Sequence, residues 1–166
     1  YCRPPYMRTR GHAMGLGATI VAFCDFTYMP ARARIADTHV KIGLTAGDGG
    51  ALMWPLLIGF PQAKRYLMTG EALTGARAAE IGLITEAFET LAEVDAKVDA
   101  LAQELATGAT MAINTTKIAI NLLLRNMLEG VIDTHMGLET HTTLSKDHAE
   151  AAYAFRDKRT PNFTGE

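Results

Sequence analysis

The stretch Gly11-His-Ala-Met-Gly-Leu-Gly-Ala-Thr-Ile-Val-Ala-Phe-Cys-Asp25 decides how this chain folds. Three glycines lie within its first seven residues, and an apolar run from Ala18 to Phe23 follows them at once. Glycine tolerates positive φ and close approach of the backbone to a ligand. A helix that begins after such a turn has free N–H groups in its first turn. The pattern predicts either an oxyanion or phosphate site or a tight turn into a core helix, and its G-x-x-x-G-x-G spacing is not the dinucleotide-binding fingerprint.

Composition limits the classes of protein to which the chain can belong. Its 166 residues are 48% hydrophobic and 20% charged, as in a single globular domain. A net charge of −2 gives no reason to expect a nucleic-acid or anionic-membrane partner. The longest apolar run, Ala51 to Phe60, is too short to span a bilayer and contains Pro55. Two cysteines, Cys2 and Cys24, suit a reducing compartment, so we expect a cytoplasmic protein.

The order of predicted elements divides the chain into three parts. Residues 1–10 form an irregular lead-in because of two adjacent prolines, and whether they are native sequence is open. Residues 11–90 mix helices with a few short strands, and residues 91–166 are helical. The first residue is not Met, so we expect the sequence to be a piece of a longer chain. The predicted strands are Phe26–Tyr28, Arg34–Asp37, Thr38–Gly43 and Leu83–Phe88.

The helices are predicted mainly from their ends. Gly59, Gly70, Gly82 and Gly108 each follow a helical segment, as C-terminal caps do. Thr90-Leu-Ala-Glu93 is a capping box, and an apolar stripe at helical spacing follows it. The predicted helices are 18–23, 52–58, 61–68, 74–81, 91–107, 111–127, 131–143 and 145–159.

Five motifs, in order and with their spacing, resemble the crotonase superfamily, the enoyl-CoA hydratase/isomerase family. They are Gly11-His-Ala-Met-Gly-Leu-Gly17 with Cys24-Asp25, Gly43-Leu-Thr-Ala-Gly-Asp-Gly-Gly50, Leu67-Met-Thr-Gly-Glu-Ala-Leu-Thr74, Ala78-Ala-Glu-Ile-Gly-Leu83 and Ala154-Phe-Arg-Asp-Lys-Arg159. The resemblance implies an α/β fold, the ββα spiral of the family, with its N-terminal part upstream of residue 1. It also implies a C-terminal α-helical trimerisation region and assembly as a homotrimer or a dimer of trimers.

The same resemblance implies an acyl-CoA substrate and a thioester enolate held in an oxyanion hole. One donor of that hole is then the backbone N–H of Leu16, and the second lies upstream of residue 1. No cofactor is implied beyond the coenzyme A of the substrate.

The side chains that the family uses for acid–base chemistry differ here. Its two hydratase glutamates fall at Thr19 and His39, and neither position holds a carboxylate. Thr19 can orient a water, and His39 titrates near neutral pH. Asp48 lies nine residues after His39, the separation found in β-diketone hydrolases of the family. The alternative is that His39 lies at a strand edge and Asp48 only forms a turn.

Other candidate residues line the substrate. His12 and Gly15 belong to the glycine turn, while Phe155 and Lys158 match family positions that contact coenzyme A. His135, His141 and His148 are expected at a surface or interface, because nothing in the sequence is spaced as a metal site. We expect no metal.

The sequence therefore predicts an enzyme that acts on an enoyl-CoA or related thioester, with a His39/Asp48 pair moving the proton. One alternative is C–C bond hydrolysis of a β-diketone. Another is a catalytically silent or truncated family member that acts as an assembly partner.

Overall fold

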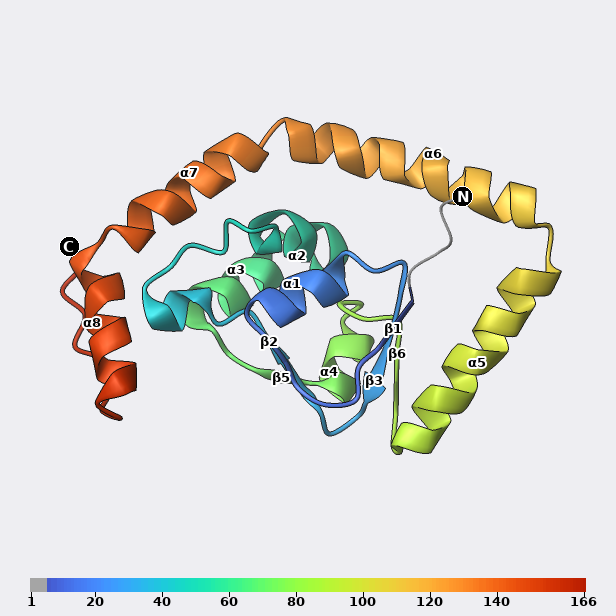
Figure 1. Cartoon of the computed structure of the whole chain (residues 1–166), viewed down its shortest axis with the longest axis horizontal. Helices are drawn as coiled ribbons and strands as arrows, with labels where there is room; N and C mark the ends of the chain where they lie inside the picture. The colour runs from blue at the N-terminus through green and yellow to red at the C-terminus, as the bar shows by residue number, and fades with distance from the viewer. Residues whose placement is uncertain (1–5) are drawn as a thin grey trace.

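The computed structural model describes residues 6–166 and is a mixed α/β structure with a long helical second half (Figure 1). The strands are β1 (Tyr6–Arg8), β2 (Ala13–Met14), β3 (Phe26–Pro30), β4 (Arg34–Ala36), β5 (Leu73–Thr74) and β6 (Glu86–Phe88). The helices are α1 (Leu16–Ala22), α2 (Gly50–Ile58), α3 (Phe60–Thr69), α4 (Gly75–Glu80), α5 (Leu91–Thr107), α6 (Thr110–Glu129), α7 (Ile132–Thr143) and α8 (Lys146–Arg156), with the 3₁₀ turn η1 (His39–Ile42).

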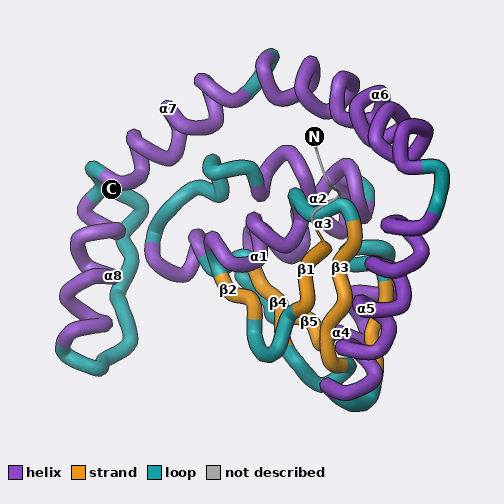
Figure 2. Tube along the Cα trace, turned by 45° about the vertical axis from the view of Figure 1, so that its right-hand side comes forward, coloured by secondary structure: helices purple, strands orange, loops and turns teal. Residues whose placement is uncertain are grey.

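Two small sheets form the β part of the described chain. The first has the order β1-β3-β6 and is parallel throughout. The second has the order β2-β4-β5, with β2 parallel and β5 antiparallel to β4. Parallel neighbours need crossover connections, and here the crossovers hold the helices α1 to α4. The sheets and these four helices form one body, as Figure 2 shows.

The core lies between the sheets and the helices α1 to α4. Trp54 of α2, Met29 of β3 and Ile35 of β4 are its largest fully buried apolar side chains. A second cluster attaches α5 to the first sheet, because Val94 and Val98 pack on Tyr28. These two valines belong to the apolar stripe that the sequence predicted for this helix.

Helix ends follow the predicted signals closely. Thr90 accepts a hydrogen bond from Glu93 N, and Glu93 accepts one from Thr90 N, so the capping box is present. Thr74 caps α4 through Arg77 N. Gly59 and Gly70 have positive φ at the ends of α2 and α3, a conformation that glycine adopts without the Cβ penalty.

The strand predicted at Thr38–Gly43 is wrong, because these residues form η1 and its flanks. Asp37 accepts the His39 N–H at 3.1 Å, and Leu44 N donates to His39 O at 2.9 Å. Gly43 then ends the turn at φ 69°. These local hydrogen bonds stabilise the turn over an extended conformation. His39 is therefore on a buried turn rather than at a strand edge.

The irregular structure predicted for residues 1–10 is also wrong in part. β1 pairs in parallel with β3, with Met7 opposite Thr27 and Arg8 opposite Tyr28. The prolines that suggested irregular structure precede this strand and fall in residues 1–5, which lie outside the described residues.

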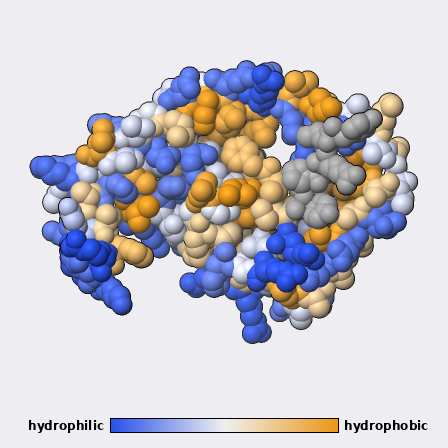
Figure 3. All heavy atoms as spheres, in the orientation of Figure 1, coloured by the Kyte–Doolittle hydropathy of each residue, from blue (hydrophilic) through white to orange (hydrophobic). Residues whose placement is uncertain are grey.

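Helices α5 to α8 form an arch around the α/β body (Figures 1 and 2). None of the residues of α6 or α7 is buried. Apolar side chains gather along the arch and on the part of the body that faces it (Figure 3). Those of α6 that are more than half exposed include Met111, Ile120, Leu122 and Leu123. Among the described residues, no helix is both long and apolar enough to cross a bilayer.

Candidate functional site

The site is built around the imidazole of His39, which lies between two aspartates. Its Nδ1 is 2.6 Å from Asp37 Oδ1, and its Nε2 is 3.5 Å from Asp48 Oδ2. The side chains of His39 and Asp37 are 10% and 1% exposed, respectively. The hydrogen bond to Asp37 raises the pKa of His39, and burial opposes this rise. The charges of both aspartates raise it further, so the imidazolium form is favoured.

Asp48 joins this imidazole to the helix of the glycine turn. Its Oδ1 accepts a hydrogen bond from the Thr19 hydroxyl at 3.0 Å. Thr19 is buried on α1, one turn after its first residue. The structure thus brings Thr19, His39 and Asp48 together, three residues that the sequence placed in one site. Asp48 Oδ2 is buried, has no hydrogen-bond partner in the described chain and lies 3.5 Å from His39 Nε2.

Helix α7 packs over the loop that carries Asp48. The Thr45 N–H donates to the Thr142 hydroxyl at 3.0 Å. A Cβ on Gly47 would lie 2.8 Å from Glu139 Cβ and would overlap the His135 carbonyl, so only glycine fits there. The negative charge of Glu139 also contributes to the raised pKa of His39. A third carboxylate therefore acts on the imidazole from the C-terminal half of the chain.

The glycine turn presents backbone donors at the start of α1. Gly15 has φ 53° and ψ −125°, a conformation open in practice only to glycine. Its N–H donates to Ala36 O at 2.9 Å, while its carbonyl accepts from Ala18 N and Thr19 N. The Leu16 N–H precedes these donors and belongs to the first turn, where no helical carbonyl is within reach. The Leu16 side chain is 59% exposed.

The remaining predicted site residues lie elsewhere. His12 uses Nδ1 to accept the Arg34 N–H at 2.9 Å, which supports β4. Phe155 is 87% exposed near the end of α8, and Lys158 follows that helix at φ 53°. His148 bonds the Ile42 carbonyl through Nδ1 at 2.7 Å, and this contact ties α8 to η1.

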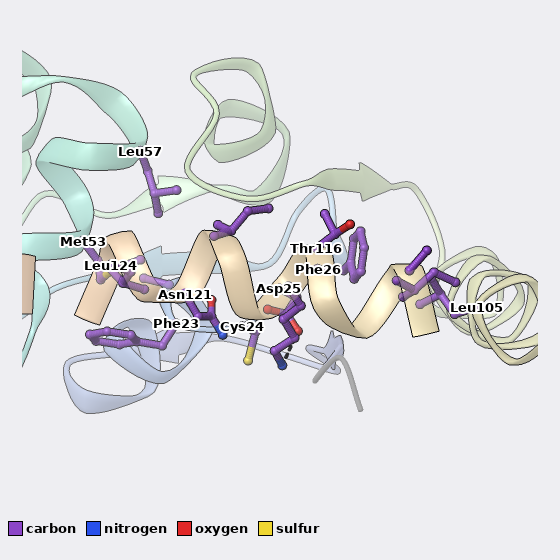
Figure 4. A pocket seen from close by; sticks show the side chains of 15 residues that line it. Phe23, Cys24, Asp25, Phe26, Met53, Leu57, Leu105, Thr116, Asn121 and Leu124 are labelled. Atoms are coloured by element: carbon purple, nitrogen blue, oxygen red, sulfur yellow. Dashed lines mark ion pairs between the residues drawn. The ribbon is translucent and has the colours of Figure 1, made fainter. Parts of the chain in front are cut away.

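A cavity of about 590 Å³ lies between α6 and the segment that leads from α1 to β3 (Figure 4). Its lining is mainly apolar and includes Phe23, Met53, Leu57 and Leu124. Asp25 and Lys117 form an ion pair at 2.7 Å in its wall, drawn as a dashed line. None of Thr19, His39 and Asp48 lines this cavity. This cavity and the polar cluster are thus separate features.

The polar cluster has a donor set that a cation could use. Asp37, His39 and Asp48 each offer one ligand atom, and these atoms lie within 4.8 Å of one another. However, the 2.6 Å contact between Nδ1 and Asp37 is a hydrogen-bond distance. It commits Nδ1 and Asp37 Oδ1 to each other and leaves Nε2, the Asp48 carboxylate and Asp37 Oδ2 as possible ligand atoms. The expectation of no metal stays a prediction.

Sequence reasoning missed Asp37, the most buried acid of the site. The predicted strand over residues 38–43 separated its side chain from that of His39, because an extended chain spreads its side chains along its length. The signal that could have found it is the Asp37-Thr-His39 spacing, since Asp bonds the backbone two residues ahead in turns.

The described chain is thus an α/β protein with a helical second half, a glycine turn that presents backbone donors, and a buried Asp–His–Asp cluster. A family model described as "Enoyl-CoA hydratase/isomerase" matches residues 8–166. The chain belongs to this family, a part of the crotonase superfamily.

Relatives of the chain carry names of acyl-CoA enzymes or their domains. It is 33% identical over 162 residues to mouse "Enoyl-CoA hydratase domain-containing protein 2, mitochondrial", covering 93% of this chain and 53% of the relative. It is 31% identical to the 1,2-epoxyphenylacetyl-CoA isomerase of Escherichia coli, covering 98% and 62%. A solved enoyl-CoA hydratase from Mycobacterium avium subsp. paratuberculosis has a TM-score of 0.89 at 30% identity, covering 97% and 65%. The chain spans roughly half to two thirds of these proteins.

Proposed function

We propose that this chain carries the proton-transfer half of an enoyl-CoA hydratase/isomerase active site, acting on an acyl-CoA thioester. The observation that carries the proposal is the contact chain from Thr19 through Asp48 to His39. It joins the helix of the glycine turn to a titratable pair. The family membership supplies the substrate class, because relatives such as the epoxyphenylacetyl-CoA isomerase are named for acyl-CoA substrates.

The proposed chemistry divides the work between backbone and side chains. The Leu16 N–H binds the thioester oxygen, on which negative charge develops in an enolate. In hydration, the His39/Asp48 pair takes a proton from water as its oxygen bonds to C3 of the enoyl group. The enolate then collapses and C2 receives a proton, so that one water is added in total. One positioned pair can carry both transfers, because the group that takes the first proton can give it back to carbon.

Hydrolysis of a β-diketone is the second candidate reaction. The observation that favours it is the His39/Asp48 contact, because the two positions where glutamates would serve hydration hold Thr19 and His39. In that reaction the pair would activate water for attack on a ketone carbonyl. The C–C bond would then break, with the leaving carbon as the enolate, and a proton would return to that carbon.

We further propose a homotrimer or a dimer of trimers, assembled through the helical region 91–166. The exposed apolar side chains of α6 support an assembled state, because large apolar patches mark interaction sites. The second oxyanion donor and the N-terminal part of the spiral would come from sequence upstream of residue 1. We propose no cofactor beyond the coenzyme A of the substrate, and a cytoplasmic location.

The test follows the absorbance of a short trans-2-enoyl-CoA with the purified protein, extended by any coding sequence upstream of Tyr1. We expect wild type to consume the conjugated double bond. His39→Ala and Asp48→Asn should each lower kcat by roughly 10²–10⁴-fold, the usual contribution of a general acid or base. His141→Ala and Asp99→Asn change exposed residues of the same types and should leave kcat unchanged.

Consumption that survives both site substitutions would contradict the His39/Asp48 assignment. If wild type leaves the enoyl-CoA intact, the same variants are assayed on a cyclic β-diketone, followed by the acid that it releases. Activity there that depends on both residues would establish the second candidate. No activity in either assay would overturn the enzymatic proposal and favour the assembly-partner alternative.

A further inference from the structure

We propose that Asp37 is a positioning residue that holds the Nδ1–H of His39 and so directs Nε2 to Asp48 and the substrate. This inference rests on the proposed function, because it assigns the working nitrogen of the imidazole used there. The geometry behind it is the 2.6 Å separation of Nδ1 and Asp37 Oδ1, against 3.5 Å between Nε2 and Asp48 Oδ2. One nitrogen is committed to a short hydrogen bond, and the other is not.

The Asp37 carboxylate is fixed before any substrate binds. Its Oδ1 also accepts the His39 backbone N–H at 3.1 Å, so one oxygen holds both the ring and the main chain. A Cβ on Gly50 would overlap Asp37 Oδ2, so the first residue of α2 closes over the carboxylate. The side chain is 1% exposed. A carboxylate packed this closely cannot turn away without moving η1 or α2.

The consequence for the imidazole is a single neutral tautomer. A carboxylate only accepts hydrogen bonds, so Nδ1 must carry the proton. The lone pair of neutral His39 then lies on Nε2, on the side of Asp48, and this is the nitrogen that takes up or gives back a proton. The charged groups that act on the ring are Asp37 before η1, Asp48 in the glycine loop and Glu139 of α7. All three are acids, and Asp37 is in contact with the ring.

Asparagine at position 37 separates this role from a merely structural one. The amide keeps the shape of the carboxylate but loses its negative charge. With its oxygen in the place of Oδ1 it accepts both His39 N–H groups more weakly, and turned over it presents N–H₂ to Nδ1. The measurement is an NMR titration of ¹⁵N-histidine-labelled protein without substrate, with His39 assigned by its absence in His39→Gln. The matched control is Asp95→Asn, which changes an acid of α5 that is paired with Arg8 of β1.

In wild type and Asp95→Asn, we expect neutral His39 to keep its proton on Nδ1. In Asp37→Asn the pKa of His39 should fall by roughly one unit or more. The neutral tautomer with its proton on Nε2 should also become populated. With an active substrate in hand, kcat should fall by up to about 10⁴-fold, the loss known when the acid behind a catalytic histidine becomes an amide. KM should change little.

An Asp37→Asn protein that is folded by circular dichroism and keeps both the titration and the Nδ1–H tautomer of wild type would overturn the proposal. A neutral His39 with its proton on Nε2 in wild type would do the same. Both readouts are taken without substrate, so they stand even if His39→Ala turns out to be fully active. The failure of this inference and that of the proposed function are therefore distinguishable.

Discussion

Carboxylates from three separate parts of the chain lie near His39 in the folded protein. The charge of His39 is therefore coupled to folding. Asp37 precedes it, Asp48 follows it in the glycine loop, and Glu139 comes from α7. In the unfolded chain these acids are far from the ring, so its pKa returns to the ordinary value of about 6.5. Folding therefore binds protons to His39 over the pH range between its two pKa values.

This coupling predicts how stability changes with pH. Because the folded-state pKa of His39 is raised, the stabilisation from its charged form is complete below pH 6.5 and is lost as pH rises through the folded-state value. We expect the free energy of unfolding of wild type, relative to His39→Gln, to fall across that range. Urea denaturation of both proteins at a series of pH values measures it. A difference that grows with pH would contradict the raised pKa.

At the scale of residues, the sequence predicted the partners of His39 unevenly. The nine-residue spacing to Asp48 was visible because both residues lie in a glycine-rich loop of recognisable pattern. Asp37 was not predicted, since its contact with the ring depends on a 3₁₀ turn that alternation of polar and apolar residues had suggested was a strand. Local side-chain hydrogen bonds of this kind leave no periodic signal.

At the scale of elements, the start of α2 controls the position of the Asp37 carboxylate. Gly50→Ala adds a Cβ that overlaps Asp37 Oδ2, so either the helix or the acid must move. We expect a loss of about 1–3 kcal/mol in the free energy of unfolding, as for other overpacked sites. The same change should lower the pKa of His39, because the short hydrogen bond between His39 Nδ1 and Asp37 lengthens.

Gly137→Ala in α7 is the matched control for this prediction. A Cβ there has no atom within 4 Å, and alanine favours a helix over glycine by about 0.5–1 kcal/mol. The midpoint temperature of thermal unfolding should therefore rise for Gly137→Ala and fall for Gly50→Ala. Equal stability of the two variants would mean that α2 can withdraw from Asp37 without cost.

Helices were predicted better than strands, and the reason is physical. A glycine cap or the Thr90/Glu93 capping box involves residues within four positions of one another, so the sequence alone predicts the helix end. The strand predicted at Leu83–Phe88 is shorter in the structure, at Glu86–Phe88, because its extent depends on its pairing with β3. Pairing joins residues far apart in the chain, which local patterns do not record.

At the scale of the whole molecule, the arch and the α/β body differ in how they are held. The body has a continuous buried core, whereas α6 and α7 contain no buried residue. The sequence predicted the helical half but not how its helices lie against the body, because amphipathic periodicity does not say which partner a face will contact.

This difference predicts unequal hydrogen exchange. In dilute protein, the amides of α6 should exchange faster than those of β3, because helices with little burial open more easily. If the exposed apolar side chains of α6 mediate self-association, its protection should rise with protein concentration. Leu123→Lys should remove that rise, while Asn126→Lys, a change at an exposed polar position of the same helix, should keep it. Protection of α6 independent of concentration in wild type would contradict self-association.

The short helix α1 carries both the backbone donor proposed at Leu16 and the Thr19 hydroxyl that binds Asp48. Three residues of α-helix place these groups about 4.5 Å apart along the axis and roughly 60° short of a full turn. An inserted or deleted residue between them would rotate Thr19 by about 100° and take its hydroxyl away from Asp48. The number of residues between Leu16 and Thr19 is therefore fixed by the site, whatever side chain the 59% exposed Leu16 position carries.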